Sequence, residues 1–295
     1  MSDRYSNYLA ASGIETLQVA GHSWQRYQGV MIPAYLPHAV PRDIGETATL
    51  ALKNSGALLA RWTEDFNSQA DGEWWFVIRD GVYVRQSLSS STRSKLSRGC
   101  RRLEARPVSP AELLQKGYAV CIAASQRYGT REFLPDRITF DRRLRAAEAV
   151  DGVVEYWGVF RDDTLVGFSE NHVQDQAVFM ESIWYDPSGL RDYSSYVLMD
   201  AILEEYLNQR DFHYVSDRSR SIYHDTGVHD FLIEKFGYRK AKAKLRVKYR
   251  PAFESAMRMS SRALPLASKM SRIRNLKAYR RLEALMLQDR IARNY

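Results

Sequence analysis

A chain of 295 residues is long enough for one large domain or two of ordinary size, and its hydrophobic content of 45% suffices for a packed core. No apolar run approaches the roughly 20 residues that span a bilayer, and residues 1–11 are too polar for a secretory signal, so we expect a cytoplasmic protein. Cys100 and Cys121 are the only cysteines, and neither has metal-type spacing, which argues against disulfides and zinc.

The positive charge is concentrated at the C-terminal end of the chain. The net charge is +8, yet residues 239–295 contain seventeen Lys or Arg against three acidic residues, a local charge of +14. Residues 1–238 therefore carry a charge of −6. This asymmetry indicates an acidic body followed by a basic segment.

The first half of the chain is predicted to mix strands and helices. Apolar runs predict strands at 22–35, 57–62 and 73–79. Basic residues at helical spacing predict a cationic helix at 92–104. A further helix begins where Ser109 can cap, Pro110 takes the first helical position and Glu112 follows three residues after the cap. We expect this helix to end at Gly129.

In the second half, the apolar period alternates between that of a helix and that of a strand. The expected elements are a helix at 140–150, a hairpin of strands at 153–160 and 165–173, a strand at 177–185, a helix at 195–207, a strand at 212–216 and a helix from Thr226 to Gly237. A polar loop at 217–225 joins the last strand to the last helix.

The clearest pattern is the alternation over residues 240–250. Apolar residues occupy one parity, Ala241, Ala243, Leu245, Val247 and Tyr249, and cations occupy the other, Lys240, Lys242, Lys244, Arg246, Lys248 and Arg250. The alternation predicts a strand with one buried face and one cationic face. After Pro251 we expect helical structure, divided at Pro265.

The order of elements from 153 to 250 is similar to the core of the GNAT superfamily of acyltransferases. The string FLIEKFGYR at 231–239 resembles the end of a helix of that superfamily, and the basic helix, strand and new helix over 92–108 resemble the junction of paired units in FemAB-like proteins. The resemblance implies an α/β fold (α+β, with mixed sheets) of tandem GNAT-like domains. These would be a degenerate N-terminal domain at 1–108, a C-terminal domain at 109–251 and a basic helical tail at 252–295.

Two departures from the superfamily bear on the donor. Acetyl-CoA-binding members place glycines before the central helix so that backbone amides approach the pyrophosphate, whereas this chain has Tyr193 and Ser195 there. Arg191 is a candidate for holding an anionic donor. Ile233 occupies the position where many members have a tyrosine as general acid. The resemblance therefore leaves two donors open, acyl-CoA and aminoacyl-tRNA.

Acyl transfer to an amine needs a group that accepts the proton of the amine. Strand alternation places Glu181 on the face of Phe179 and Ile183, and it places Glu170 on the face of His172. A carboxylate on an apolar strand face is either functional or paired with a structural cation. We therefore predict Glu170 and Glu181 as candidate catalytic bases.

The polar loop follows a strand end, where α/β sheets commonly bind ligands. It provides His224 as a further catalytic candidate and a predicted substrate-binding set consisting of Asp217, Ser219, Arg220 and Tyr223, with His229 on the next helix. The alternative is a solvated loop whose polar residues only cap the helix or turn the backbone. The histidine spacings match no metal-ligand motif, so no metal is expected.

The cationic strand face is predicted to bind a polyanion through Lys240, Lys242, Lys244, Arg246 and Lys248. Neutralising phosphates by such cations releases counterions, and both tRNA and an anionic membrane surface fit this requirement. A peripheral position at the inner membrane face is therefore the alternative to a purely cytoplasmic one. An edge strand that uses lysine to prevent edge pairing would explain the same pattern without a partner.

The function predicted from these observations is that of an acyl- or aminoacyltransferase acting on an amine, such as an amino sugar or a peptide precursor. The alternative function is that of a catalytically inactive GNAT fold that binds RNA or an anionic membrane through its basic C-terminal region.

Overall fold

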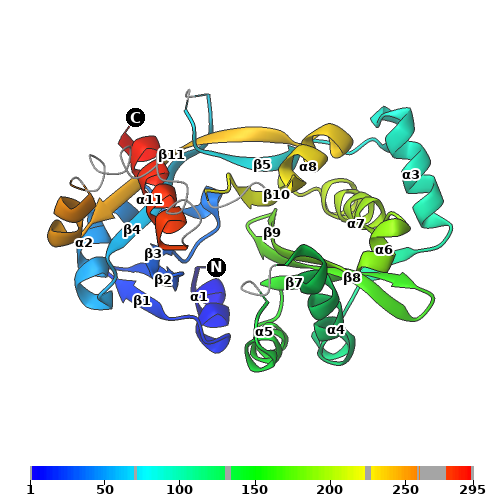
Figure 1. Ribbon diagram of the computed structural model, residues 1–295, viewed down its shortest axis with the longest axis horizontal. Helices are drawn as coiled ribbons and strands as arrows, with labels where there is room; N and C mark the ends of the chain where they lie inside the picture. Colours follow the sequence, from blue (N-terminus) through cyan, green and yellow to red (C-terminus); the bar gives the residue numbers. More distant parts are fainter. Residues whose placement is uncertain are drawn as a thin grey trace. The chain divides into compact units, whose positions relative to one another are not determined.

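The computed structural model describes residues 2–69, 72–129, 134–222, 227–257, 259 and 277–293. The chain forms two compact units (Figure 1). The first unit comprises Met1–Gly13, Val77–Arg218 and His229–Arg239, and the second comprises Ile14–Phe76, Ser219–Val228 and Lys240–Tyr295. Each unit joins segments that are distant in sequence, and the first contains most of the predicted C-terminal domain together with the first helix of the chain.

The sheet of the first unit is mixed. An antiparallel meander consists of β6 (Glu104–Pro107), β7 (Val154–Arg161), β8 (Thr164–Gln174) and β9 (Ala177–Tyr185). Next to β9 lies β10 (Tyr214–Ser219), which is parallel to β9, and then β5 (Trp75–Asp80). The predicted hairpin is confirmed, and its turn places Asp162 at a φ of 51°, a conformation that aspartate tolerates.

Two groups of helices pack on this sheet. The helices of the unit are α1 (Ser2–Ala11), α3 (Ser90–Cys100), α4 (Pro110–Tyr128), α5 (Arg137–Ala149), α6 (Pro187–Arg191), α7 (Ser194–Leu203) with a π-helical extension (Glu204–Gln209), and α8 (Val228–Phe236). In one group, α4 packs on β8 and β9, α5 packs on α4, and α1 packs on α5. In the other, α7 packs on β6, β7 and β8, and α3 packs on α7.

The predicted signals at the ends of α4 are confirmed. The Ser109 side chain accepts a hydrogen bond from the Glu112 backbone nitrogen at 3.2 Å, with Pro110 in the first turn. At the other end, Gly129 has a φ of 61° and donates its backbone N–H to Ser125 O, which a residue with a side chain would do less easily.

The second unit is built on an antiparallel ladder with one parallel pair. Its strands are β1 (Thr16–Val19), β2 (His22–Tyr27), β3 (Val30–Pro33), β4 (Leu59–Ser68) and β11 (Arg239–Tyr249), in that order across the sheet. Its helices include α2 (Ile44–Ser55) and α11 (Lys277–Arg293). The single predicted strand at 22–35 is two strands, because Gln28 and Gly29 form a turn with φ of 51° and 81°.

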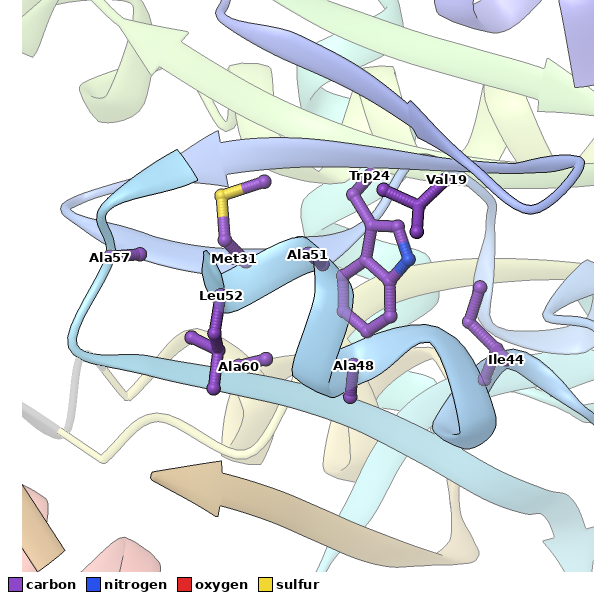
Figure 2. Close-up of a cluster of buried hydrophobic side chains, with 9 residues drawn as sticks. All are labelled: Val19, Trp24, Met31, Ile44, Ala48, Ala51, Leu52, Ala57 and Ala60. Carbon is purple, nitrogen blue, oxygen red and sulfur yellow. The ribbon is translucent and has the colours of Figure 1, made fainter. Parts of the chain in front are cut away.

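The core of the second unit lies between α2 and the first strands. Figure 2 shows this cluster, to which Trp24 from β2, Met31 from β3 and Leu52 from α2 belong. The indole nitrogen of Trp24 donates to the Thr47 hydroxyl at 2.9 Å, so the polar atom of this buried ring is satisfied. The helix α2 is thereby fixed to the sheet by both packing and a hydrogen bond.

None of the helices in the described part of the chain is both long and apolar enough to cross a membrane.

The buried face of α2 can be tested against its exposed face. Leu52 is 4% exposed and Leu50, in the same helix, is 47% exposed. Leu52→Ala should lower the free energy of unfolding by about 2–5 kcal/mol, because it removes buried contacts and leaves a cavity. Leu50→Ala should change it by no more than about 0.5 kcal/mol. Urea unfolding followed by tryptophan fluorescence measures both values, and equal effects would contradict this packing.

Candidate functional site

The candidate site lies where the parallel strands β9 and β10 stop pairing. Their register covers Tyr214 to Ser216 against Ala177 to Phe179, although both strands continue beyond these residues. Asp217 follows directly on β10, and Glu181 lies two residues further on β9. In α/β sheets, ligands bind at the carboxyl ends of parallel strands. The predicted residues Glu181 and Asp217 are therefore brought to the same end of the sheet.

A β-bulge positions Glu181. Glu170 pairs with Ser182 and Asn171 pairs with Met180, so that Glu181 is one extra residue on β9. The bulge interrupts the two-residue alternation from which Glu181 was predicted to share the face of Phe179 and Ile183. A bulge of this kind changes the direction of the side chain at the extra residue. Glu181 is partly exposed, whereas its neighbour across the strands, Glu170, is buried.

Glu170 accepts hydrogen bonds from three elements. Its Oε1 atom accepts from the Tyr8 hydroxyl at 3.0 Å and contacts His172 Nε2 at 3.1 Å, and its Oε2 atom accepts from Ser182 Oγ at 3.4 Å. The contact with His172 agrees with the alternation along β8. On the other side of the imidazole, Nδ1 lies 3.2 Å from the Tyr5 hydroxyl. A closed polar network thus surrounds this carboxylate in the interior of the first unit.

The network holds Glu170 in its ionised form. Burial alone raises the pKa of Glu170, but the hydrogen bond and charge of His172, the charge of Arg143 and the hydrogen bond of Tyr8 together lower it to about 2. A carboxylate with such a low pKa is a weak proton acceptor at neutral pH. The structure thus gives Glu170 the environment of a paired, structural carboxylate.

Sequence patterns did not identify three members of this network: Tyr5, Tyr8 and Arg143. Tyr5 and Tyr8 come from α1, and their three-residue spacing, with Leu9 adjacent, is the signal of a buried helix face. Arg143 comes from α5, where it stands among several arginines that look alike in sequence. Its partly buried charge is stabilised by Glu170, and Glu181 contributes as well.

Asp217 has the opposite environment to Glu170. It is 2% exposed, and burial raises its pKa, an effect that the carboxylate of Glu181 increases and that Arg218 and His229 only partly oppose. His229 Nε2 lies 2.9 Å from the backbone oxygen of Asp217 and 3.5 Å from its Oδ2 atom. The predicted residues Asp217 and His229 thus contact each other, and Asp217 retains its proton to a higher pH than an exposed aspartate would.

The remaining residues of the polar loop are placed as follows. Ser219 and Arg220 belong to the second unit, where the Arg220 guanidinium binds the backbone oxygen of Glu73 at 2.8 Å and its carboxylate at 3.2 Å. Tyr223 and His224 lie outside the described residues. The catalytic role predicted for His224 therefore stays a prediction.

The N-terminus of α7, where the predicted donor-binding residues lie, is covered by α3. A side chain at Gly99 would stand 3.2 Å from the backbone oxygen of Asp192 and 2.7 Å from Val197, which shows how closely the two helices approach. Tyr193 has a φ of 67°, and the Arg98 guanidinium lies 4.8 Å from its ring centroid. Ser194, the first residue of α7, is fully buried.

This arrangement does not fit a pyrophosphate at the N-terminus of α7. A phosphate bound at a helix N-terminus needs backbone N–H groups that it can reach closely. Here Gly99 of α3 packs close to Asp192 and Val197, and the Arg98 guanidinium lies over the ring of Tyr193, so protein atoms crowd the residues at the start of α7. Ser195 is half-buried in the first turn, and Arg191 is exposed before the helix.

The cations of β11 alternate with buried residues as predicted, but some of them form ion pairs with carboxylates. Lys244 binds Asp65 at 2.8 Å and Arg246 binds Glu64 at 2.8 Å, both on the neighbouring strand β4. Lys240 lies 4.5 Å from the ring centroid of Trp75, Lys242 is half-buried and Lys248 is exposed. Polyanion binding by this face stays a prediction, supported by fewer free charges than the sequence suggested.

The strand β11 is not an edge strand. It pairs with β4 from Leu59 to Ser68, and on its other side the Ala243 backbone nitrogen donates to Trp74 O at 3.1 Å. Protection of a sheet edge therefore does not explain its lysines.

The basic tail contributes to the core of the second unit. Leu282, Leu285 and Met286 of α11 pack against a buried cluster of Leu59 and Tyr249. The apolar face of this helix is therefore used inside the unit rather than left available to a lipid surface.

Across the described ranges, no three His, Cys, Asp or Glu side chains are grouped as the ligands of a metal ion would be.

The sequence matches no protein-family model and no curated protein. Solved structures match it in fold. The C-terminal domain of a protein assigned as a lysylphosphatidylglycerol synthetase from Agrobacterium fabrum has a TM-score of 0.57 at 14% identity, covering 88% of this chain and 91% of that chain. FemX has a TM-score of 0.55 at 8% identity, with coverages of 81% and 88%. L-PGS from Bacillus licheniformis has a TM-score of 0.50 at 13% identity, with coverages of 82% and 86%.

At these identities the likeness concerns the fold, and it confirms the predicted mixed α/β, GNAT-like architecture.

The environment of Glu170 makes the stability of the protein depend on pH. Because its folded-state pKa of about 2 lies below the ordinary value of 4.5, ionised Glu170 stabilises the fold above pH 4.5, and this contribution is lost as the pH falls toward 2. Glu170→Gln should therefore lower the free energy of unfolding by about 2–3 kcal/mol more at pH 6 than at pH 2.

Denaturant titrations of both proteins between pH 6 and the lowest pH at which they remain folded measure this difference. Glu148→Gln, on the exposed side of α5, is the control and should follow the wild type throughout. A gap between Glu170→Gln and the wild type that stays constant with pH would contradict the assignment.

Proposed function

We propose that the protein is a FemAB-like transferase that moves an acyl or aminoacyl group onto an amine at the end of β9 and β10. The observation that carries the proposal is the pair of carboxyl groups Glu181 and Asp217 on these adjacent strands, within two residues of their last paired positions. Parallel strand ends of this kind are ligand-binding positions, and the shared fold with the aminoacyl-related structures above supports the reaction class.

Glu181 is the group that we propose as the general base. It is partly exposed at a bulge, so an incoming ammonium group can reach it, and it is not enclosed by the donors that surround Glu170. Glu170 is better suited to holding the bulge, since it binds Ser182, the residue after Glu181. Carboxyl groups with different environments in one site commonly have different roles.

The reaction follows from these roles. Glu181 accepts a proton from the ammonium group of the acceptor, and the free amine attacks the carbonyl carbon of the donor. A C–N bond forms and the carbonyl oxygen takes up negative charge. The bond between this carbon and the oxygen or sulfur of the carrier then breaks, the carrier leaves with the second proton that the attacking nitrogen loses, and Glu181 releases the first proton to solvent. Asp217, whose pKa is raised by burial, lies on the adjacent strand beside this step.

The covered N-terminus of α7 favours an aminoacyl-tRNA donor over acyl-CoA. With α3 packed against Asp192 and Tyr193, the usual place for a pyrophosphate is filled by the protein itself. The name of one structural neighbour, lysylphosphatidylglycerol synthetase, describes the attachment of an aminoacyl group, which supports the same donor class. The acceptor that we propose is the amino group of an amino sugar or a peptide precursor.

We do not favour an inactive fold that binds RNA or a membrane through its basic end. Lys244 and Arg246 are paired with carboxylates of the same unit, and the apolar face of α11 is packed inside that unit. On a surface that binds RNA or a membrane, these cations and this apolar helix face would be expected to be available to the partner.

Removal of the proposed base should abolish transfer without unfolding the protein. Glu181→Gln should reduce turnover by about 10²–10⁴-fold, since the amide cannot accept the proton. Its thermal midpoint should stay within about 2 °C of the wild type, because the side chain is partly exposed and sits outside the buried network. Release of labelled amino acid from tRNA to a panel of amines measures turnover, with Glu148→Gln as the active control. A stable, fully active Glu181→Gln protein would remove Glu181 from this role.

Donor choice can be tested by ligand-induced stabilisation. Acetyl-CoA at micromolar concentration should leave the thermal midpoint unchanged, since the α7 N-terminus is covered. Aminoacyl-tRNA should raise it, because a ligand that binds only the folded state stabilises that state by about 2.7 kcal/mol at a concentration of 100 Kd. The thermal midpoint measured with uncharged tRNA is the control, because it shows how much of the stabilisation comes from the tRNA alone rather than from the aminoacyl group. A clear shift with acetyl-CoA would contradict the proposed donor.

A further inference from the structure

Tyr238 follows α8 and is buried with an unsatisfied hydroxyl group. The residue is 3% exposed, and within the described structure its hydroxyl has no hydrogen-bond partner. Other buried tyrosines of the first unit do bond: Tyr8 donates to Glu170 at 3.0 Å, Tyr83 donates to Asp200 at 2.8 Å and Tyr206 donates to Glu155 at 2.7 Å. Those three hydroxyls are paired with carboxylates, whereas the hydroxyls of Tyr238 and of Tyr156 on β7 are buried without such a partner.

An unpaired buried hydroxyl destabilises the folded state, because it loses its hydrogen bonds to water and gains none in return. Phenylalanine would fill the same space without this cost. A tyrosine at such a position is explained when the hydroxyl has a partner that arrives from outside, such as a substrate.

The elements next to Tyr238 are those that adjoin the candidate site. Gly237 has a φ of 69° and reverses the chain after α8, and a side chain at Gly237 would lie 3.8 Å from Arg79 Nε on β5. The strand β5 lies next to β10, since Ser216 Oγ donates to Val77 O at 3.1 Å. Asp217 follows Ser216 on β10. The helix α8, which precedes Tyr238, contacts it through His229, whose Nε2 atom lies 2.9 Å from the backbone oxygen of Asp217.

The electrostatic neighbours of the hydroxyl agree with this position. Burial and then the charge of Asp217 raise the pKa of Tyr238 well above its ordinary value, and Tyr185 of β9 contributes in the same direction, while Arg79 opposes it. Tyr238 therefore has neighbours on both strands whose pairing ends at the site. Its hydroxyl keeps its proton at neutral pH and can therefore donate a hydrogen bond there.

We propose that the Tyr238 hydroxyl donates a hydrogen bond to the carbonyl oxygen of the acyl group during transfer, and is thus a further catalytic residue. This inference rests on the function proposed above. When the amine attacks, the carbonyl π electrons move to oxygen, and the donor hydrogen bond strengthens as this oxygen becomes an alkoxide. The hydroxyl keeps its proton throughout, Glu181 receives the proton of the amine, and the double bond re-forms as the carrier leaves.

The position of the Tyr238 hydroxyl also bears on the presence of isoleucine at position 233, where the superfamily resemblance implies a tyrosine. The superfamily resemblance places a tyrosine hydroxyl at the residue that is Ile233 here, within α8, and no hydroxyl can come from that side chain. Tyr238 supplies a hydroxyl from the residue after Gly237 instead. Its role differs from that of a general acid because it stabilises negative charge without transferring a proton.

The test compares Tyr238→Phe with Tyr83→Phe, which makes the same chemical change at a buried tyrosine whose hydroxyl already binds Asp200. In Tyr238→Phe, kcat for aminoacyl or acyl transfer should fall about 10²-fold, with KM within about twofold, because the lost bond forms fully only in the transition state. The thermal midpoint of the ligand-free protein should stay the same or rise. In Tyr83→Phe, the midpoint should fall and kcat should stay at the wild-type value.

Two results would overturn the inference while leaving the proposed function in place. One is a Tyr238→Phe protein with wild-type kcat in an assay where Glu181→Gln is inactive. The other is a lower thermal midpoint for Tyr238→Phe, which would show that the hydroxyl has a structural partner in the folded protein. A wild-type protein that transfers nothing from acyl-CoA or aminoacyl-tRNA would instead contradict the proposed function, and the inference with it.

Discussion

The first unit depends on the burial of an ionised carboxylate. Placing Glu170 in the interior would by itself be strongly unfavourable, because an isolated charge loses its hydration. The structure offsets this with Tyr8 from α1, His172 from β8, Ser182 from β9 and the charge of Arg143 from α5. Elements separated by more than a hundred residues in sequence are therefore required to meet around one side chain.

That requirement has a consequence for the neighbouring strand. The bond from Ser182 to Glu170 fixes the residue after the bulge, and the bulge makes Glu181 project differently from the strand residues around it. The three carboxyl groups then divide into distinct states. Glu170 is held ionised, Asp217 is buried with a raised pKa, and Glu181 lies between them with access to solvent. Their differing environments, rather than their residue types, are the reason for proposing Glu181 as the general base.

Patterns with a fixed period were predictable from sequence, and patterns that depend on a partner were not. The alternation over β11 correctly placed Ala241, Ala243 and Leu245 in the interior, because a strand in a sheet has a period of two whatever lies beside it. The bulge at Glu181 was not predictable, since it exists only in the register between β9 and β8. The neutralisation of Lys244 by Asp65 likewise joins residues that are close in space alone.

The candidate site shows the same division. Sequence reasoning selected Glu170 and Glu181 because they share strand faces with apolar residues or a histidine, and it selected Asp217 and His229 because they belong to the polar loop after a strand end and to the helix that follows. It did not select Tyr5 and Tyr8, whose helical spacing in a short, polar first helix gives no indication of the strand that they reach. Tyr238 was also passed over, as a tyrosine after a helix-ending glycine resembles an ordinary core residue until its hydroxyl is seen to lack a partner.

The two departures from the GNAT pattern have one structural explanation. In a fold whose central helix binds a pyrophosphate, both the helix N-terminus and a tyrosine on the later helix must face the cofactor. Here α3 packs against the first residues of α7, which Gly99 permits because any side chain there would meet Asp192 O and Val197. Once that position is filled by protein, neither small residues before α7 nor a hydroxyl at Ile233 is required. In the proposed function, the chemistry depends instead on groups at the ends of β9 and β10 and on the residue that follows α8, namely Asp217, Glu181 and Tyr238.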